Sequence, residues 1–511
     1  MKKIIISTIA VSALLFTTSC ETDFDTDVKD VKVTNGEADF SKYVALGNSL
    51  TSGYRDNALY IDGQNESYPL MLSQQMQLAG GGAFNQPLMA DNNGGLLLGG
   101  VKIADTKQYI NTFVNGTPDI KNANSNTPTT DVLNKLTGPF GNMGIPGAKV
   151  AHLLAPGYGN PAGIGTTANP YFARFASSSG TSVIADFVSQ SPTFFSLWIG
   201  NNDALLYALA GADGSVETLT PADQFKTYYN LLVTQIKATN AKGVIANIPD
   251  VTTIPNLTTV PYNPITASVL GNGNVTVGNA TIDNLNSTIY GPLNQILTAL
   301  NAGDRIKPLS KTQANPLLIK DESLTNLGAQ ITYAAANSGN ATLAALAPYL
   351  GATYGQARQA KEGDLIPLNS KSAIGTLEVL PSGVPASLGA RGVAYPFADK
   401  YVLTATEVVE VNTAIASYNA TIKAAADTHG FAFVDANAKM KELNDKSGIS
   451  WDGVKYSAKY VTGGAFSLDG VHLTGRGYAI VANEFIKSIN AKYKSTLPQV
   501  DPNKYSGVKF P

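Results

Sequence analysis

Residues 43–53 read Tyr-Val-Ala-Leu-Gly-Asn-Ser-Leu-Thr-Ser-Gly, an apolar run that ends at Gly47 and passes into a polar turn. A short, continuously apolar run is typical of a strand that is covered on both faces, as in a parallel sheet. The turn places Ser49 where a strand gives way to a helix, and ligands of open α/β folds bind beyond the carboxyl ends of the strands. Taken alone, Gly-Asn-Ser is ordinary turn chemistry, so the role of Ser49 depends on other segments.

Three more apolar runs, residues 193–199, 244–248 and 431–434, have the same character and are predicted to be buried strands. Helical patterns lie between and after them. The segment Thr220-Pro221-Ala222-Asp223 predicts a helix start, with Thr220 as the N-cap and Pro221 at the first helical position. A capping-box pattern spans Thr404–Glu407, and we expect a last helix to begin at Thr474. This alternation of strands and helices predicts a doubly wound α/β core.

The chain divides into segments of different character. Residues 41–250 and 396–495 carry the strand–helix alternation and are predicted to form one core. Within the first part, residues 55–140 are irregular, with Gly-rich and Asn-rich turns and few clear elements. Residues 251–395 are too many for a structureless loop, so we expect an inserted subdomain with a small core of its own. Residues 496–511 form a C-terminal tail.

The N-terminus predicts export. Lys2 and Lys3 precede an apolar stretch over residues 4–16, which is shorter than the roughly 20 residues that a membrane-spanning helix needs. Small residues then precede Cys20, the single cysteine of the chain, and this arrangement resembles the bacterial lipobox. Residues 1–19 are therefore interpreted as a lipoprotein signal peptide and Cys20 as the lipidated mature N-terminus. An ordinary leader with a chance cysteine is the alternative.

Residues 20–40 begin with an acidic stretch, which we interpret as a solvated tether between the lipid anchor and the folded domain. The stretch resembles the acidic sorting segments that send some Bacteroidetes lipoproteins to the cell surface. The expected location is therefore outside the cytoplasm, on a membrane reached through the lipid anchor. The outer membrane is the first expectation, and exposure on the cell surface is an open alternative.

Charge and composition exclude some classes of function. The formal net charge is −2 and no basic tract is present, which does not suit a nucleic-acid-binding protein. Once Cys20 carries lipid, neither a disulfide nor a cysteine metal site can form. The three histidines, His152, His429 and His472, are widely dispersed, so no zinc site is expected either.

Three further segments supply what a serine nucleophile needs. Gly147 lies in a Gly-x-x-Gly segment whose backbone can approach a ligand and donate an N–H group. Asn202 follows the second apolar run and can donate a hydrogen bond to an oxyanion. Asp469 precedes His472 by three positions, so its carboxylate can accept from imidazole Nδ1–H and leave Nε2 to take the serine proton. The alternatives are a Pro-Gly turn, a helix cap formed by Asn202 or Asp203, and a chance Asp–His pair.

In this order, the segments resemble the SGNH hydrolases, also called GDSL esterases and lipases. That family has a Gly-Asp-Ser-Leu turn, a glycine, a Gly-x-Asn-Asp turn and a late Asp-x-x-His block. The blocks here are Gly47–Leu50, Gly147, Gly200–Asp203 and Asp469–His472. The resemblance implies a flavodoxin-like, three-layer α/β/α core around a parallel sheet, into which the large insertion is placed.

The resemblance also implies roles for single residues. Ser49 is expected to be the nucleophile, His472 the general base and later the general acid, and Asp469 the residue that orients His472. The oxyanion hole is expected to comprise the backbone N–H groups of Ser49 and Gly147 and the side chain of Asn202. No cofactor and no metal ion are implied. One departure is Asn48, which stands where the family has aspartate.

The expected reaction is hydrolysis of a carboxylic ester, of a small molecule, a lipid or a glycan, through an acyl-enzyme. A carbohydrate O-acetyl esterase is the alternative within the same chemistry. An apolar groove under residues 251–395 would favour fatty acyl chains, whereas an open, aromatic-rimmed cleft would favour sugars. A third hypothesis, motivated by Asn48 and the insertions, is a non-catalytic binding lipoprotein on the surface.

Overall fold

The computed structural model of the chain describes residues 32–114 and 116–511. The predicted signal peptide, Cys20 and the first part of the predicted tether lie outside the described residues. Within the described part of the chain, no helix has both the length and the apolar character needed to cross a membrane.

A parallel sheet forms the centre of the core, and its strands within the described ranges follow the order β11-β8-β7-β1-β6. Their bounds are β1 (Tyr43–Gly47), β6 (Asn142–Gly144), β7 (Phe194–Trp198), β8 (Lys242–Ala246) and β11 (Ala432–Val434). Numbered along the chain, this is the flavodoxin-like order 2-1-3-4-5, whose direction of winding reverses between the first and third strands. The predicted fold class is confirmed. The reversal between β1 and β7 opens a crevice at the carboxyl ends of these two strands.

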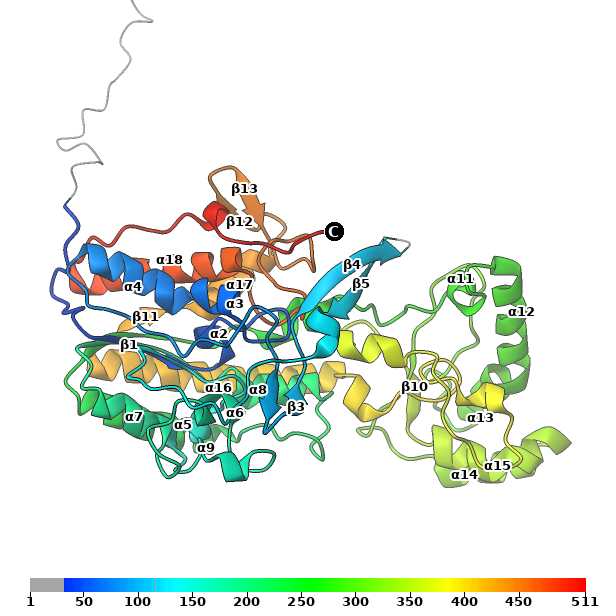
Figure 1. Ribbon diagram of the computed structural model, residues 1–511. Helices are drawn as coiled ribbons and strands as arrows, with labels where there is room; N and C mark the ends of the chain where they lie inside the picture. Colours follow the sequence, from blue (N-terminus) through cyan, green and yellow to red (C-terminus); the bar gives the residue numbers. More distant parts are fainter. Residues whose placement is uncertain (1–31, 115) are drawn as a thin grey trace, which may run out of the picture.

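Helices cover both faces of the sheet (Figure 1). On one face lie α4 (Tyr68–Leu78) and α18 (Gly475–Tyr493), and on the other α5 (Val150–Leu154), α7 (Val183–Ser189), α9 (Ala222–Lys237) and α16 (Ala405–His429). The strands are buried almost throughout, and their side chains join those of the helices in one hydrophobic cluster. This burial explains why the strands are apolar at every position rather than at alternate ones.

Two of the three predicted helix starts are confirmed. Thr404 and Glu407 form a reciprocal capping box at the start of α16, and Thr474 caps α18. The third is wrong by one residue, because Pro221 is the N-cap of α9 and the helix begins at Ala222. The hydroxyl of Thr220 instead donates to Asp203 Oδ1 at 3.0 Å. A buried carboxylate next to Thr220 therefore replaces the expected cap interaction.

Residues 55–140 contain more regular structure than expected. The short helix α3 (Ile61–Asn65) precedes α4, which buries Tyr68, Met71 and Leu72 in the core. Two hairpins follow: β2 (Leu96–Leu98) with β3 (Val101–Ala104), and β4 (Gln108–Val114) with β5 (Thr117–Asn122). The expectation of few clear elements was wrong because the sequence signals for α4 are weak, and packing against α18 and the sheet fixes it as a helix.

A second hydrophobic cluster lies within residues 260–402, beside the core (Figure 1). It is built on α11 (Ala267–Leu270), α12 (Val275–Leu285), α13 (Gly291–Ala299), α14 (Gly328–Ala336), α15 (Ala341–Tyr354) and the hairpin of β9 (Leu318–Lys320) and β10 (Ala357–Gln359). Arg358 lies buried here between the carboxylates of Asp321 and Asp364, at 2.5 and 2.6 Å. A buried guanidinium needs such partners, because removing one of them would leave an uncompensated buried charge.

Candidate active site

Ser49 lies at the point where β1 passes into the one-turn helix α2 (Ser49–Ser52). Asn48 caps this helix, because its Oδ1 accepts from the backbone N–H of Leu50 at 3.1 Å. The preceding Gly47 has no room for a side chain, since a Cβ there would lie 2.5 Å from the Trp198 carbonyl oxygen. The tight turn therefore presents Ser49 at the sheet edge, and Asn48 performs a capping role that an aspartate would also perform.

The structure brings Ser49, His472 and Asp469 together, although Ser49 and His472 are 423 positions apart. His472 Nε2 lies 2.8 Å from Ser49 Oγ, and His472 Nδ1 lies 2.9 Å from Asp469 Oδ2. The carboxylate can therefore hold the proton on Nδ1, which leaves Nε2 as the acceptor for the serine proton. The Tyr54 ring packs against the imidazole, with the two ring centroids 4.6 Å apart.

Several donors hold the carboxylate of Asp469. The backbone N–H groups of Val471 and His472 donate to Oδ1, each at 2.8 Å, and that of Asn57 donates to Oδ2 at 2.9 Å. Burial by itself raises the pKa of Asp469, but the charge of His472 and these hydrogen bonds outweigh burial and hold the pKa well below its usual range. Asp469 therefore stays ionised and keeps His472 in one orientation.

Sequence reasoning missed the residues that position Asp469. Asp56 and Asn57 have φ angles of 51° and 61°, left-handed values that are uncommon for residues other than glycine. This turn directs the N–H of Asn57 at Asp469 and the N–H of Asp56 at Ser467 Oγ, at 3.0 Å. The hydroxyl of Ser467 in turn lies 3.2 Å from Asp469 Oδ1. The adjacent Asp-Asn pair was the available signal, because these residues tolerate the left-handed region best.

The three expected oxyanion donors line one cleft together with His472. Gly147 is exposed in this cleft and has a φ of 81°, and a Cβ at this position would meet nothing closer than 4.0 Å. Within the described part of the chain, no backbone carbonyl accepts from the N–H of Ser49 or Gly147. One N–H of the Asn202 amide donates to the Ala148 carbonyl at 2.9 Å, which leaves the second for a ligand. These groups can jointly bind a developing negative charge.

Asp203 fixes the loop that carries Gly147. It lies in the first turn of α8 (Asn202–Leu209), and its Oδ2 accepts from the N–H of Val150 at 3.0 Å. Burial raises the pKa of Asp203 to about 6, although hydrogen bonds from Val150 and Thr220 act in the opposite direction. The alternative in which Asn202 or Asp203 caps α8 is wrong, because Asn201 is the N-cap residue and both side chains bond elsewhere.

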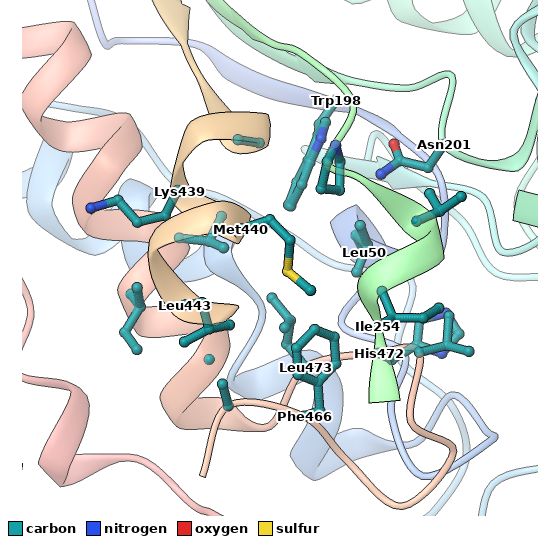
Figure 2. A pocket seen from close by; sticks show the side chains of 18 of the residues that line it. Leu50, Trp198, Asn201, Ile254, Lys439, Met440, Leu443, Phe466, His472 and Leu473 are labelled. Carbon is teal, nitrogen blue, oxygen red and sulfur yellow. The ribbon is translucent and has the colours of Figure 1, made fainter. Parts of the chain in front are cut away.

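Two cavities of different character meet at Ser49. One is an apolar pocket of about 100 Å³ between α17 (Ala436–Asn444), α18 and the carboxyl ends of β7 and β11. Figure 2 shows Met440 reaching into its centre, with Leu50 and Leu443 among the surrounding side chains. The other is the open cleft with a cavity volume of about 1190 Å³. Both are lined in part by Ser49, Asn202 and His472.

The remaining histidines lie away from this site. His152 stacks on Tyr158 and accepts from the N–H of Lys149 at 3.1 Å, and His429 ends α16. Among residues 32–114 and 116–511, no three His, Cys, Asp or Glu side chains are grouped so that they could hold a metal ion.

Comparison with known proteins gives one match. A family model described as GDSL-like Lipase/Acylhydrolase matches residues 332–485, a range that contains Asp469 and His472 but not Ser49, Gly147 or Asn202. No curated protein and no solved structure matches the chain. The family match supports the resemblance to the SGNH/GDSL hydrolases and, at the level of the family, a hydrolase of the ester type.

Replacing Asp469 by asparagine tests the support of His472. Because the folded-state pKa of Asp469 lies below the unfolded value of about 3.9, the stability that its ionised form contributes is fully present above pH ~4 and is lost as the pH falls further. Urea unfolding at several pH values should show wild type more stable than Asp469→Asn at pH 5 to 8, with a smaller difference at pH 3. A difference in stability that stays constant or grows at pH 3 would contradict this assignment.

Asp469→Asn should also lower kcat by about 10⁴-fold, while the control Asp186→Asn retains activity.

Proposed function

We propose that the protein is a serine hydrolase of carboxylic esters, of the GDSL-like lipase/acylhydrolase type. The observation that carries the proposal is the continuous pair of hydrogen bonds from Asp469 through His472 to Ser49. Groups arranged in this order activate a serine hydroxyl as a nucleophile. The family match at residues 332–485 supports the same chemistry at a coarser level.

In the proposed reaction, His472 Nε2 takes the proton of Ser49 Oγ as this oxygen forms a bond to the ester carbonyl carbon. The carbonyl oxygen becomes an oxyanion and is bound by the N–H groups of Ser49 and Gly147 and by the Asn202 amide. When the intermediate collapses, the bond to the alcohol oxygen breaks and that oxygen takes the proton from His472. A water molecule, deprotonated by His472, then releases the acid and restores the Ser49 hydroxyl.

The apolar pocket supports an acyl group longer than acetyl. Its lining is mainly aliphatic and aromatic. Two charged side chains also line it, Lys439 and Glu484, and they form an ion pair with each other at 3.2 Å. An apolar cavity of ~150 Å³ can hold benzene, so about 100 Å³ suits the tail of an acyl chain of roughly four to six carbons. An acetyl group would leave this space empty, which argues against a specialised O-acetyl esterase.

The pocket is formed differently from the groove considered for residues 251–395. Core residues supply most of its wall, with the largest shares from α17 and α18, and the insertion contributes only its first residues, Val251 and Ile254. The acyl preference therefore depends mainly on core residues.

The non-catalytic hypothesis has less support. Asn48, which motivated it, caps α2 through its side-chain oxygen and leaves Ser49 within 2.8 Å of the imidazole. A decayed site would not need the five separate donors that hold the Asp469 carboxylate.

Export and lipid anchoring remain part of the proposal and rest on the sequence around Cys20 alone. A lipid at this position would hold the hydrolase at a membrane, with the outer membrane as the proposed site and the cell surface as an alternative. Anchoring of this kind suits an enzyme whose substrates lie outside the cytoplasm.

Substitution of the nucleophile tests the proposed activity. Ser49→Ala should lower kcat/KM on nitrophenyl hexanoate by about 10⁶-fold, whereas Ser287→Ala, which removes a hydroxyl far from the site, should retain it. Near-identical fold and stability should be verified by circular dichroism. Equal rates for wild type and Ser49→Ala would end the enzyme hypothesis.

The acyl pocket is tested with nitrophenyl esters of increasing chain length. We expect wild-type kcat/KM to rise about fourfold for each added methylene, because burying one is worth ~0.8 kcal/mol, and to level off at roughly four to six carbons. Met440→Ala should move this plateau to longer chains, while Met440→Leu, which nearly conserves volume, should not. Identical chain-length profiles for wild type and Met440→Ala would show that the acyl group binds elsewhere.

Cys20→Ser tests anchoring. Expressed in a bacterium that processes lipoproteins, the wild-type chain should enter the detergent phase of a Triton X-114 separation, because its acyl chains partition there. Cys20→Ser should stay in the aqueous phase or keep its leader, and Thr22→Ala should behave as wild type. Equal partitioning of wild type and Cys20→Ser would rule out lipidation at this cysteine.

A further inference from the structure

The open cleft and the acyl pocket meet at Ser49. Ser49, Asn202 and His472 line both cavities, so an ester held at Ser49 has one half in each. If the acyl half fills the apolar pocket, the alcohol half must lie in the cleft. The cleft volume of about 1190 Å³ exceeds the 300–1,000 Å³ of typical sites for drug-sized ligands. A small alcohol such as ethanol would leave most of it unused.

Three separate parts of the chain form the walls of the cleft. The hairpin β4–β5 contributes Gln108, Thr117 and Asn122, and the core contributes one side of α8 along its whole length. The third wall comes from residues 251–395, through α10 (Pro255–Thr258) and the 3-10 helix η6 (Leu368–Ala373). Figure 1 shows the hairpin on the side of the core that faces the insertion. The large insertions thus surround the alcohol side of the site.

The walls of the cleft are almost uncharged, and amide and hydroxyl side chains lie among leucine and tyrosine side chains. Apart from Asp469, which is bonded to His472, Lys371 is the one charged side chain among the described residues that line the cleft. Phosphate or carboxylate groups are usually bound by arginine or by several cations, and a single exposed lysine does not provide this. Amide side chains, in contrast, both donate and accept, as alcohol hydroxyl groups do. Asn57, Asn369 and Gln108 bring such amides into the cleft from three separate segments.

Gln108 gives the most direct indication of a ligand. Its Oε1 is buried and has no hydrogen-bond partner among the described residues, whereas its backbone N–H is bonded to the Asp56 carbonyl at 2.8 Å. Buried acceptors are rarely left unpaired in folded proteins. Because Gln108 lines the cleft, a rotation of its amide would bring this oxygen within reach of a hydroxyl group of a bound molecule, while the bond to Asp56 fixes its strand position.

We propose that this cleft binds the alcohol half of the substrate and that this alcohol is an uncharged, polyhydroxylated molecule of at least disaccharide size. The inference rests on the proposed ester hydrolysis and adds the identity of the leaving group. The substrate is then an ester that joins a short or medium acyl chain to a carbohydrate-like alcohol. During its release, the leaving hydroxyl takes its proton from His472 and stays within reach of the amides of the cleft.

The test compares hexanoyl esters of three alcohols: monohexanoyl sucrose, ethyl hexanoate and trihexanoylglycerol, with nitrophenyl hexanoate as the reference. For the full-length wild type, we expect kcat/KM on the sucrose ester to exceed that on ethyl hexanoate by at least tenfold, mainly through a lower KM. Equal values for the sucrose and ethyl esters, or a higher value for trihexanoylglycerol than for the sucrose ester, would overturn the proposal.

Variants assign the preference to the cleft. Gln108→Leu and Asn369→Ala should each lower the ratio of kcat/KM on the sucrose ester to that on ethyl hexanoate by fivefold or more. Asn111→Ala, which removes an amide from the same hairpin outside the cleft lining, should leave this ratio unchanged. Thermal unfolding separates a folding defect from a binding one, because Gln108→Leu removes an unpaired buried acceptor and should unfold at or above the wild-type temperature. An unchanged ratio in both cleft variants would overturn the proposal.

A binding measurement keeps this inference separate from the proposed activity. Calorimetric titration of Ser49→Ala with monohexanoyl sucrose should show binding that is weakened at least fivefold in Ser49→Ala/Gln108→Leu. If wild type fails to hydrolyse nitrophenyl hexanoate, the proposed function is wrong, but this titration still decides whether the cleft binds the sugar. If wild type is active and Ser49→Ala binds the sucrose ester no more tightly than ethyl hexanoate, only the inference about the alcohol fails.

Discussion

The contact of His472 Nε2 with Ser49 Oγ, at 2.8 Å, is the constraint on which the site depends. It joins the end of β1 to the loop before α18, and almost the whole chain lies between these two residues. Such a contact requires that the first strand lie in the middle of the sheet and that the last helix pack back across it. The strand order β11-β8-β7-β1-β6 meets this requirement, because β1 lies beside β7 where the winding reverses. Ser49 and Asn202 therefore emerge next to each other, from strands that are neighbours in space but not in sequence.

Sequence patterns predicted the parts of this arrangement that are local. Apolar runs identified the long strands, since strands buried on both faces need apolar side chains throughout, and the short motifs identified Ser49, Asp469 and His472. The support of Asp469 could not be predicted in the same way, because Asn57 contacts Asp469 across 412 positions of the chain and Asp56 contacts Ser467 across 411. Nothing in the sequence of either segment requires the other. The predicted role of Thr220 was wrong for a related reason. Its hydroxyl could cap the next helix locally, but it donates instead to the buried Asp203 carboxylate, which only the fold brings near.

Beside the proposed oxyanion donors, the fold keeps a buried carboxylate, that of Asp203, whose burial is unfavourable on its own. Asp203 is a buried carboxylate whose pKa is raised to about 6 by burial, so its charged form at neutral pH costs free energy. Its two bonds, to Val150 N–H and to the Thr220 hydroxyl, connect α8 with α5 and with the start of α9. Asn202 adds a bond to the Ala148 carbonyl. Together, these two residues fix the loop of Gly147 relative to Ser49, and a rigid arrangement of donors is what stabilisation of an oxyanion requires.

The insertion provides no side chain of the proposed catalytic triad, yet it is connected to these residues through Asn256. The side chain of this residue donates to the Asp469 carbonyl at 2.8 Å and its backbone N–H to the Gly470 carbonyl at 2.9 Å. The same side chain accepts from the N–H of Leu368, at the start of η6, at 3.3 Å. One wall of the cleft is thus bonded to the loop that orients His472. The acyl pocket is formed mainly by core residues, so exposed positions within residues 251–395 can change without altering it. Asn256, in contrast, holds this wall of the cleft in a fixed position relative to the loop of Asp469 and His472.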